Sequence, residues 1–104
     1  MKNRFKNKVV WITGGGGGLG KAIAIQFACE GAMVAVSGRR ENNLNATVRE
    51  IERENSQGLA IQCDVSKEDE IIDAVSQIVN SFGRLDVAIA NAAVPMTGKV
   101  ENIS

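Results

Sequence analysis

The chain has 104 residues, 44% of them hydrophobic, and its twelve basic and twelve acidic residues cancel to a net charge of zero. This length allows at most one small domain, and the hydrophobic share is too high for a disordered chain. The balanced charge argues against nucleic acid as a partner, because nucleic-acid-binding domains normally carry a basic surplus.

Short β-like runs alternate with longer helical patterns along the chain. Strands are expected where apolar, mostly β-branched residues form short runs, and helices where apolar residues recur three or four positions apart. Gly31 and Gly83 provide stop signals for the first and third helices. In chain order the predicted elements are a strand at 8–13, a helix at 18–30, a strand at 33–37, a helix at 41–55, a strand at 59–63, a helix that ends at Phe82 and a strand at 86–90.

The apolar positions of each helix predict the side that packs on the sheet. These positions are Leu19, Ile23 and Phe27 in the first helix, Leu44, Val48 and Ile51 in the second, and Ile71, Ile72, Val75, Ile78, Val79 and Phe82 in the third. Ser66 and Asp69 have the spacing of a capping box at the start of the third helix.

The alternation of strands and helices predicts an α/β fold. Apolar strands without polar alternation are typical of a parallel sheet that is covered on both faces. Right-handed crossovers then constrain the layout, and we expect a Rossmann-type sheet with strand order 3-2-1-4 and helices on both faces. In that order the first two helices cover one face and the third helix covers the other.

Five consecutive glycines follow the first strand, and they fit two phosphate-binding templates. Residues 15–21 match the P-loop pattern G-x-x-x-x-G-K, but Ala22 stands where that loop needs a hydroxyl to bind magnesium. The second template is a dinucleotide-binding turn, which needs a strand, then glycines, then a helix N-terminus that faces the phosphates. The chain has all three parts in that order, and the dinucleotide template is favoured.

The motif TGGGGGLG, from Thr13 to Gly20, resembles the T-G-x-x-x-G-x-G turn of the short-chain dehydrogenase/reductase family. Three further stretches are similar to signatures of that family and follow in the family's order. They are Cys63-Asp64-Val65 after the third strand, Phe82-Gly83-Arg84-Leu85-Asp86 before the fourth strand, and Asn91-Ala92-Ala93 after it. The resemblance covers nearly the whole chain, although Ala93 replaces the glycine that the family carries there.

The resemblance implies a cofactor-binding role for several residues. Thr13, Gly14, Gly18, Leu19 and Gly20 belong to the turn that lines the pyrophosphate and the nicotinamide ribose. Asp64 would accept a hydrogen bond from the adenine amino group, with the backbone of Val65 beside it. Asn91 and Ala92 would lie along the cofactor ribose. For Asp64 the open alternative is a turn carboxylate, and for Asn91 a residue that stabilises the strand ends.

The end of the second strand is the position that discriminates between the two nicotinamide cofactors. A carboxylate there favours NAD, because it bonds the ribose 2′-OH and repels a 2′-phosphate. This chain has Gly38 at that position, followed by Arg39, whose guanidinium can bind a phosphate through paired hydrogen bonds. Ser37 could add a hydroxyl contact. We therefore predict NADP(H) in preference to NAD(H).

The resemblance also indicates what residues 1–104 do not contain. The family uses a tyrosine as general acid with a lysine four positions later, and this chain has no tyrosine. We therefore expect a partial NAD(P)-binding Rossmann domain that ends after its fourth strand, with no catalytic residue of its own. The full-length protein is expected to be a homo-oligomeric oxidoreductase that interconverts an alcohol and a carbonyl or reduces a related unsaturated substrate. The alternatives are a non-catalytic dinucleotide-binding module and a P-loop phosphohydrolase.

The sequence also gives expectations about cellular location and metal binding. The first apolar run, from Val9 to Ile12, is too short for a signal peptide or a membrane span, so a cytoplasmic location without membrane contact is expected. The chain has no histidine, and Cys29 and Cys63 lack CxxC spacing, so no metal site is predicted.

Overall fold

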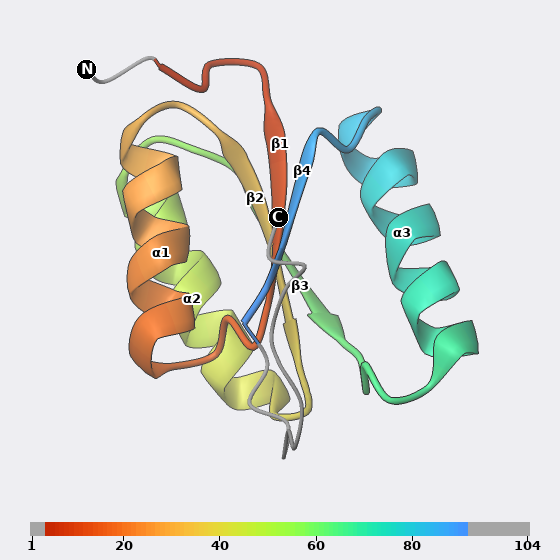
Figure 1. Cartoon of the computed structure of the whole chain (residues 1–104). Coiled ribbons are helices and arrows are strands. Elements are labelled where there is room, and N and C mark those ends of the chain that lie inside the picture. Colours follow the sequence, from red (N-terminus) through yellow and green to blue (C-terminus); the bar gives the residue numbers. More distant parts are fainter. Residues whose placement is uncertain (1–3, 92–104) are drawn as a thin grey trace.

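Four parallel strands form the centre of the computed structural model, which describes residues 4–91 (Figure 1). The strands alternate with three helices along the chain, as the sequence predicts. The elements are β1 (Val9–Thr13), α1 (Gly18–Cys29), β2 (Met33–Gly38), α2 (Glu41–Arg53), β3 (Gly58–Gln62), α3 (Glu68–Phe82) and β4 (Val87–Ala90).

The strand order is β3-β2-β1-β4, which confirms the predicted order 3-2-1-4. Both central strands pair in parallel along their length, so Thr13 at the end of β1 lies beside Ser37 of β2 and Ala90 of β4. Figure 1 shows α1 and α2 on one face of the sheet and α3 on the other. The carboxyl ends of all four strands therefore meet at one edge, where the loops into the helices begin.

The two sheet faces bury separate hydrophobic clusters. Val10 and Ile12 of β1 face the cluster under α1 and α2, while Val9 and Trp11 face the cluster under α3. This two-sided burial follows from the period of two along a strand, and it explains why β1 is apolar from Val9 to Ile12. The central strand thereby anchors both layers of helices.

Helix α1 packs through a different face from the one predicted. Its buried residues are Gly20, Ala24 and Ala28, whereas Leu19 is 68% exposed. Ile23 and Phe27 are only partly buried at the margin of the cluster. The physical reason is size, because small residues at this spacing let the helix backbone approach the sheet closely. The large apolar residues then lie to the side of the contact.

Helix α3 also departs from the prediction at two points. Ala74 and Ile78 form its buried face, while Ile72 and Val79 are 60% and 41% exposed. The capping box is wrong, because α3 begins at Glu68 and the Ser66 hydroxyl donates to Asp64 Oδ1 at 2.7 Å instead of capping the helix. The Ser66 hydroxyl thus bonds the Asp64 carboxylate and does not take part in the capping interaction that the pattern predicted for α3.

Asp86 fastens β4 to β1 at the start of their pairing. Its carboxylate Oδ2 accepts a hydrogen bond from the backbone N–H of buried Val9 at 2.8 Å, and its own N–H donates to the Val9 carbonyl at 3.0 Å. The Val9 amide, followed by Arg84, holds the pKa of Asp86 below its ordinary value. A carboxyl with a depressed folded-state pKa stabilises the fold while it is ionised and loses this contribution as the pH falls through that pKa.

We predict that Asp86→Ala lowers the melting temperature at pH 7 by several degrees, because the buried Val9 amide loses its acceptor. The gap between wild type and variant should stay constant down to about pH 4 and shrink below it. Thermal unfolding at several pH values measures both effects. Asp73→Ala is the matched control, since within residues 4–91 the Asp73 side chain accepts only an exposed hydrogen bond from Gln77. Equal melting temperatures for the two variants would contradict the role of Asp86.

Candidate functional site

The glycine run forms a tight turn from β1 into α1. Gly14 has a positive φ of 69°, and the backbone N–H groups of Gly14 and Gly15 both donate to the Ser37 carbonyl, at 2.7 and 3.1 Å. Gly18 opens α1 with a φ of 56°, a conformation that suits glycine far better than other residues. The N-cap residue, Gly17, has no side chain that could cap this helix, so within residues 4–91 its first N–H groups have no side-chain cap and its positive dipole end is left for another acceptor.

Gly20 marks the closest approach of α1 to β1. A Cβ atom at this position would lie 2.1 Å from the Gly14 carbonyl oxygen and 2.6 Å from Asn91 Nδ2, both far inside contact distance. At Gly17 and Gly18 a Cβ would meet nothing within 4 Å. The glycines thus have different roles, with Gly20 required for packing and the surface of Gly17 and Gly18 left open for a ligand to approach.

Thr13 and Asn91 join the ends of β1 and β4 beside this turn. The Thr13 hydroxyl accepts a hydrogen bond from the Asn91 backbone N–H at 2.9 Å and lies 3.4 Å from the Ile89 carbonyl. The Asn91 side-chain amide lies against Gly20. The structure therefore brings Thr13, Gly14, Gly20 and Asn91 together, and it gives Asn91 the strand-stabilising role that the sequence left open.

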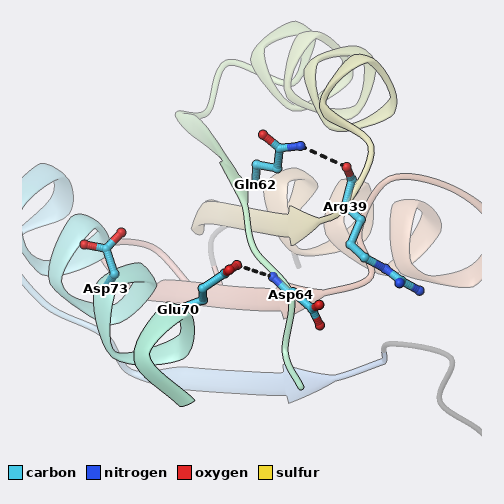
Figure 2. A pocket seen from close by; sticks show the side chains of 5 residues that line it. All are labelled: Arg39, Gln62, Asp64, Glu70 and Asp73. Carbon is cyan, nitrogen blue, oxygen red and sulfur yellow. Dashed lines mark hydrogen bonds between the residues drawn. The ribbon is translucent and has the colours of Figure 1, made fainter. Parts of the chain in front are cut away.

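Two clefts flank the exit of β2, and Arg39 lines both of them. The first has a volume of about 230 Å³ and holds two arginines beside the glycine turn. Its described lining residues are Gly14, Gly16, Gly17, Gly38, Arg39, Arg40, Asn43 and Leu44. The second, of about 510 Å³, lies between β3 and α3 and adds Gln62, Asp64, Glu70 and Asp73 (Figure 2). The two clefts share Arg39, with the glycine turn in the lining of the first and Asp64 in the lining of the second.

Asp64 is held in place by its own loop. Its Oδ1 accepts from the Ser66 N–H at 2.9 Å and from the Ser66 hydroxyl, and its N–H donates to Glu70 Oε1 at 2.8 Å (Figure 2). The Ser66 hydrogen bonds, with smaller contributions from Arg39 and Lys67, lower the pKa of Asp64 below its ordinary value. Asp64 therefore acts as a turn carboxylate, and both hydrogen bonds from Ser66 go to its Oδ1 atom. Val65 packs against the α3 cluster beside it.

Ser37 does not offer its hydroxyl to either cleft, and this expectation needs correction. The side chain is fully buried on the α3 face of the sheet, where its Oγ accepts a hydrogen bond from Trp11 Nε1 at 2.9 Å. The alternation of side chains along β2 puts Ser37 on the same face as Ala35. Ser37 contributes to the site through its carbonyl, which holds the glycine turn.

The remaining predicted positions are Leu19, Arg39 and Ala92. Leu19 lies exposed in the first turn of α1 beside the glycines, and Arg39 is exposed at the end of β2. Ala92 lies outside the described residues, as does Ala93. Two contributors were not predicted: Asn43, which lines the first cleft, and Thr47, whose hydroxyl bonds the Gly15 carbonyl. The sequence does carry a signal for Thr47, because it is a polar residue among the apolar positions of α2 that face the sheet.

Comparison with known proteins agrees with this geometry. The family described as short chain dehydrogenase matches residues 8–104. The chain belongs to the short-chain dehydrogenase family. This membership favours the dinucleotide template over the P-loop template for the glycine turn.

Two relatives illustrate the similarity in sequence. The short-chain dehydrogenase/reductase homolog YusS of Bacillus subtilis is 40% identical over 89 residues, which cover 85% of this chain and 82% of that protein. The 3beta-hydroxysteroid dehydrogenase of Mediterraneibacter gnavus is 38% identical over 94 residues, which cover 90% of this chain and 34% of that protein.

Solved structures show the same fold over the same portion. A hydroxysteroid dehydrogenase from Escherichia coli superposes with a TM-score of 0.85 at 35% identity, covering 89% of this chain and 40% of that one. An NAD⁺-bound xylitol dehydrogenase superposes with a TM-score of 0.84 at 30% identity, covering 88% of this chain and 35% of that one. The chain thus spans about two fifths of these dehydrogenases, although it spans most of YusS.

Residues 4–91 include neither a helix long and apolar enough to cross a membrane nor a group of three or more His, Cys, Asp or Glu residues arranged to hold a metal ion.

The close approach at Gly20 gives a testable contrast with Gly17. Gly20→Ala should lower the free energy of unfolding by about 1–3 kcal/mol, because the overpacked backbone contact outweighs the roughly 1 kcal/mol that alanine gains in a helix. Gly17→Ala should stay within about 0.5 kcal/mol of wild type, since its φ of −176° is extended and the space is open. Urea denaturation measures both, and an equally stable Gly20→Ala variant would show that the turn is looser than described.

Proposed function

We propose that the chain is the cofactor-binding portion of an NADP(H)-dependent oxidoreductase that interconverts an alcohol and a carbonyl. The observation that carries the cofactor choice is the first cleft, where Arg39 and Arg40 flank the glycine turn and none of the described lining residues is an acid. Gly38 supplies no carboxylate at the end of β2 to repel a 2′-phosphate. Two guanidinium groups there favour the phosphorylated dinucleotide.

Three features of residues 4–91 support a nicotinamide dinucleotide as the ligand. The open surface over Gly17 and Gly18 lets a pyrophosphate approach the N-terminus of α1, whose dipole and N–H groups favour negative charge. Arg39 makes no side-chain hydrogen bond within residues 4–91 and lies between this turn and Asp64. Asp64 Oδ2, which its own loop does not engage, is the acceptor we assign to the adenine amino group.

The bound cofactor would supply hydride transfer, and the described residues would bind and orient it. Thr13 and Asn91 keep the strand ends and the glycine turn in register, and Leu19 and Asn91 lie where the ribose next to the nicotinamide would pass. The tyrosine and lysine that the family uses for proton transfer are not among residues 1–104. We therefore assign proton transfer, the substrate pocket and the homo-oligomer contacts to groups outside residues 1–104.

A second candidate is a dinucleotide-binding module without chemistry. The relative YusS favours it, since the chain covers 82% of that homolog and only about 34–40% of the dehydrogenases. Reading the coding sequence past Ser104 separates the two candidates. A serine followed by Tyr-x-x-x-Lys supports the oxidoreductase, while a stop codon close to Ser104 supports the module.

The cofactor choice predicts a change of preference in the double variant Gly38→Asp, Arg39→Ala. The ratio of the NADP⁺ to NAD⁺ affinities should fall by about tenfold or more, because a charged hydrogen bond to the 2′-phosphate is lost and a repelling carboxylate is gained. The aspartate fits, since a Cβ at Gly38 would lie 3.4 Å from Leu44 Cδ2. Isothermal titration calorimetry of the 104-residue chain with both nucleotides measures the ratio.

Arg49→Glu is the matched control, since Arg49 is an exposed arginine of α2 that lines neither cleft and this change lowers the net charge by the same amount as the double variant. Its affinity ratio should equal that of wild type. An unchanged ratio in the double variant would overturn the NADP(H) assignment, and failure of the wild-type chain to bind either nucleotide would overturn the proposed function as a whole.

A further inference from the structure

Thr47 is a fully buried polar residue on the apolar face of α2. Its neighbours on that face, Leu44 and Ile51, are also buried, so a residue of pure packing function would be apolar here. A buried hydroxyl is costly unless it forms a hydrogen bond. The identity of its partner therefore decides what Thr47 does.

The Thr47 hydroxyl has two acceptors within reach. The Gly15 carbonyl lies at 2.9 Å, whereas the Asn43 carbonyl, one helical turn earlier, lies at 3.3 Å. A hydroxyl has a single proton to donate, and the shorter distance assigns it to Gly15. The bond therefore crosses from α2 to the glycine turn, 32 residues away in sequence, and is more than the local bond that threonine often makes in helices.

Gly15 is thereby held from two sides. Its N–H donates to the Ser37 carbonyl of β2 at 3.1 Å, and its carbonyl accepts from Thr47. The same turn rests against α2 at Gly16, where a Cβ would lie 3.1 Å from Asn43 Cβ. The residues that follow, Gly17 and Gly18, have no such neighbours. A five-glycine segment has high conformational freedom, so these two attachments limit the states that it can sample.

We propose that Thr47 is a positioning residue for dinucleotide binding, whose hydroxyl holds the Gly15 carbonyl and so keeps the outward N–H groups of the turn in the phosphate-binding arrangement. The proposal rests on the proposed function of the turn. Thr47 touches no cofactor atom, and it acts by raising the fraction of molecules whose turn is ready to bind. Apparent affinity falls in proportion to that fraction when the tether is lost.

The test compares Thr47→Val, which keeps the shape and removes the hydroxyl, with Thr47→Ser, which keeps the hydroxyl. Titration of the 104-residue chain with NADP⁺ should give about tenfold weaker binding for Thr47→Val and near-wild-type binding for Thr47→Ser. Hydrogen–deuterium exchange without nucleotide should speed up in the peptide that contains Gly15 to Gly18 only for Thr47→Val. If Thr47→Val does not fold, Thr47→Ala replaces it and must show the same losses.

Val48→Ala is the control for simple destabilisation of α2, because Val48 packs near Gly58 of β3 and away from the turn. It should lower the melting temperature and leave the NADP⁺ affinity unchanged. The positioning role of the Thr47–Gly15 hydrogen bond would be overturned if Thr47→Val kept the NADP⁺ affinity and the exchange rate of wild type. It would also be overturned if Thr47→Ser weakened NADP⁺ binding as much as Thr47→Val does. Absence of NADP⁺ binding by the wild-type chain would instead overturn the function on which the tether rests.

Discussion

The structure depends on the close contact between the Gly14 carbonyl and the backbone of Gly20. The carbonyl oxygen occupies the space that a Cβ at Gly20 would need, so the first strand and the first helix meet with no side chain between them. Gly14 and Gly18 provide the positive φ values that bring the chain around so tightly. As a result α1 starts at the edge of the sheet, with its N-terminus beside the ends of β1 and β4. The small residues Ala24 and Ala28 continue this close packing along α1.

Parallel pairing then gathers the polar groups of the site at one edge. Because all four strands run in the same direction, Thr13, Arg39, Asp64 and Asn91 lie at or just after the carboxyl ends of different strands, along the same edge of the sheet. Most of them also support the scaffold, as Thr13 does for Asn91 and Ser66 does for Asp64. The site therefore consists of groups whose positions are already fixed by structural hydrogen bonds, and Arg39 is the exception, exposed on the surface between two clefts.

Element order, strand order and the glycine turn were predictable because each has a local signal or a strong topological rule. Apolar runs and helical spacing mark the seven elements, and right-handed crossovers restrict how they assemble. The errors concern competition between partners. Smaller residues occupy the buried face of α1, where Leu19 was expected, and the Ser66 hydroxyl bonds Asp64 rather than capping α3. Helical spacing alone does not reveal how closely a helix approaches the sheet, nor which of two acceptors a hydroxyl meets.

The amino-acid sequence by itself determined the parallel α/β architecture, the glycine turn between the first strand and the first helix, and the absence of a tyrosine within residues 1–104. These properties reside in residue types and spacings along the chain. Only the tertiary structure decided that the Ser37 hydroxyl faces Trp11, that Arg39 borders two clefts and that Thr47 reaches Gly15. The reason is that each of these contacts joins different elements, 26 to 32 residues apart in the two hydrogen bonds. Such contacts depend on sheet register and helix placement, which no local pattern records.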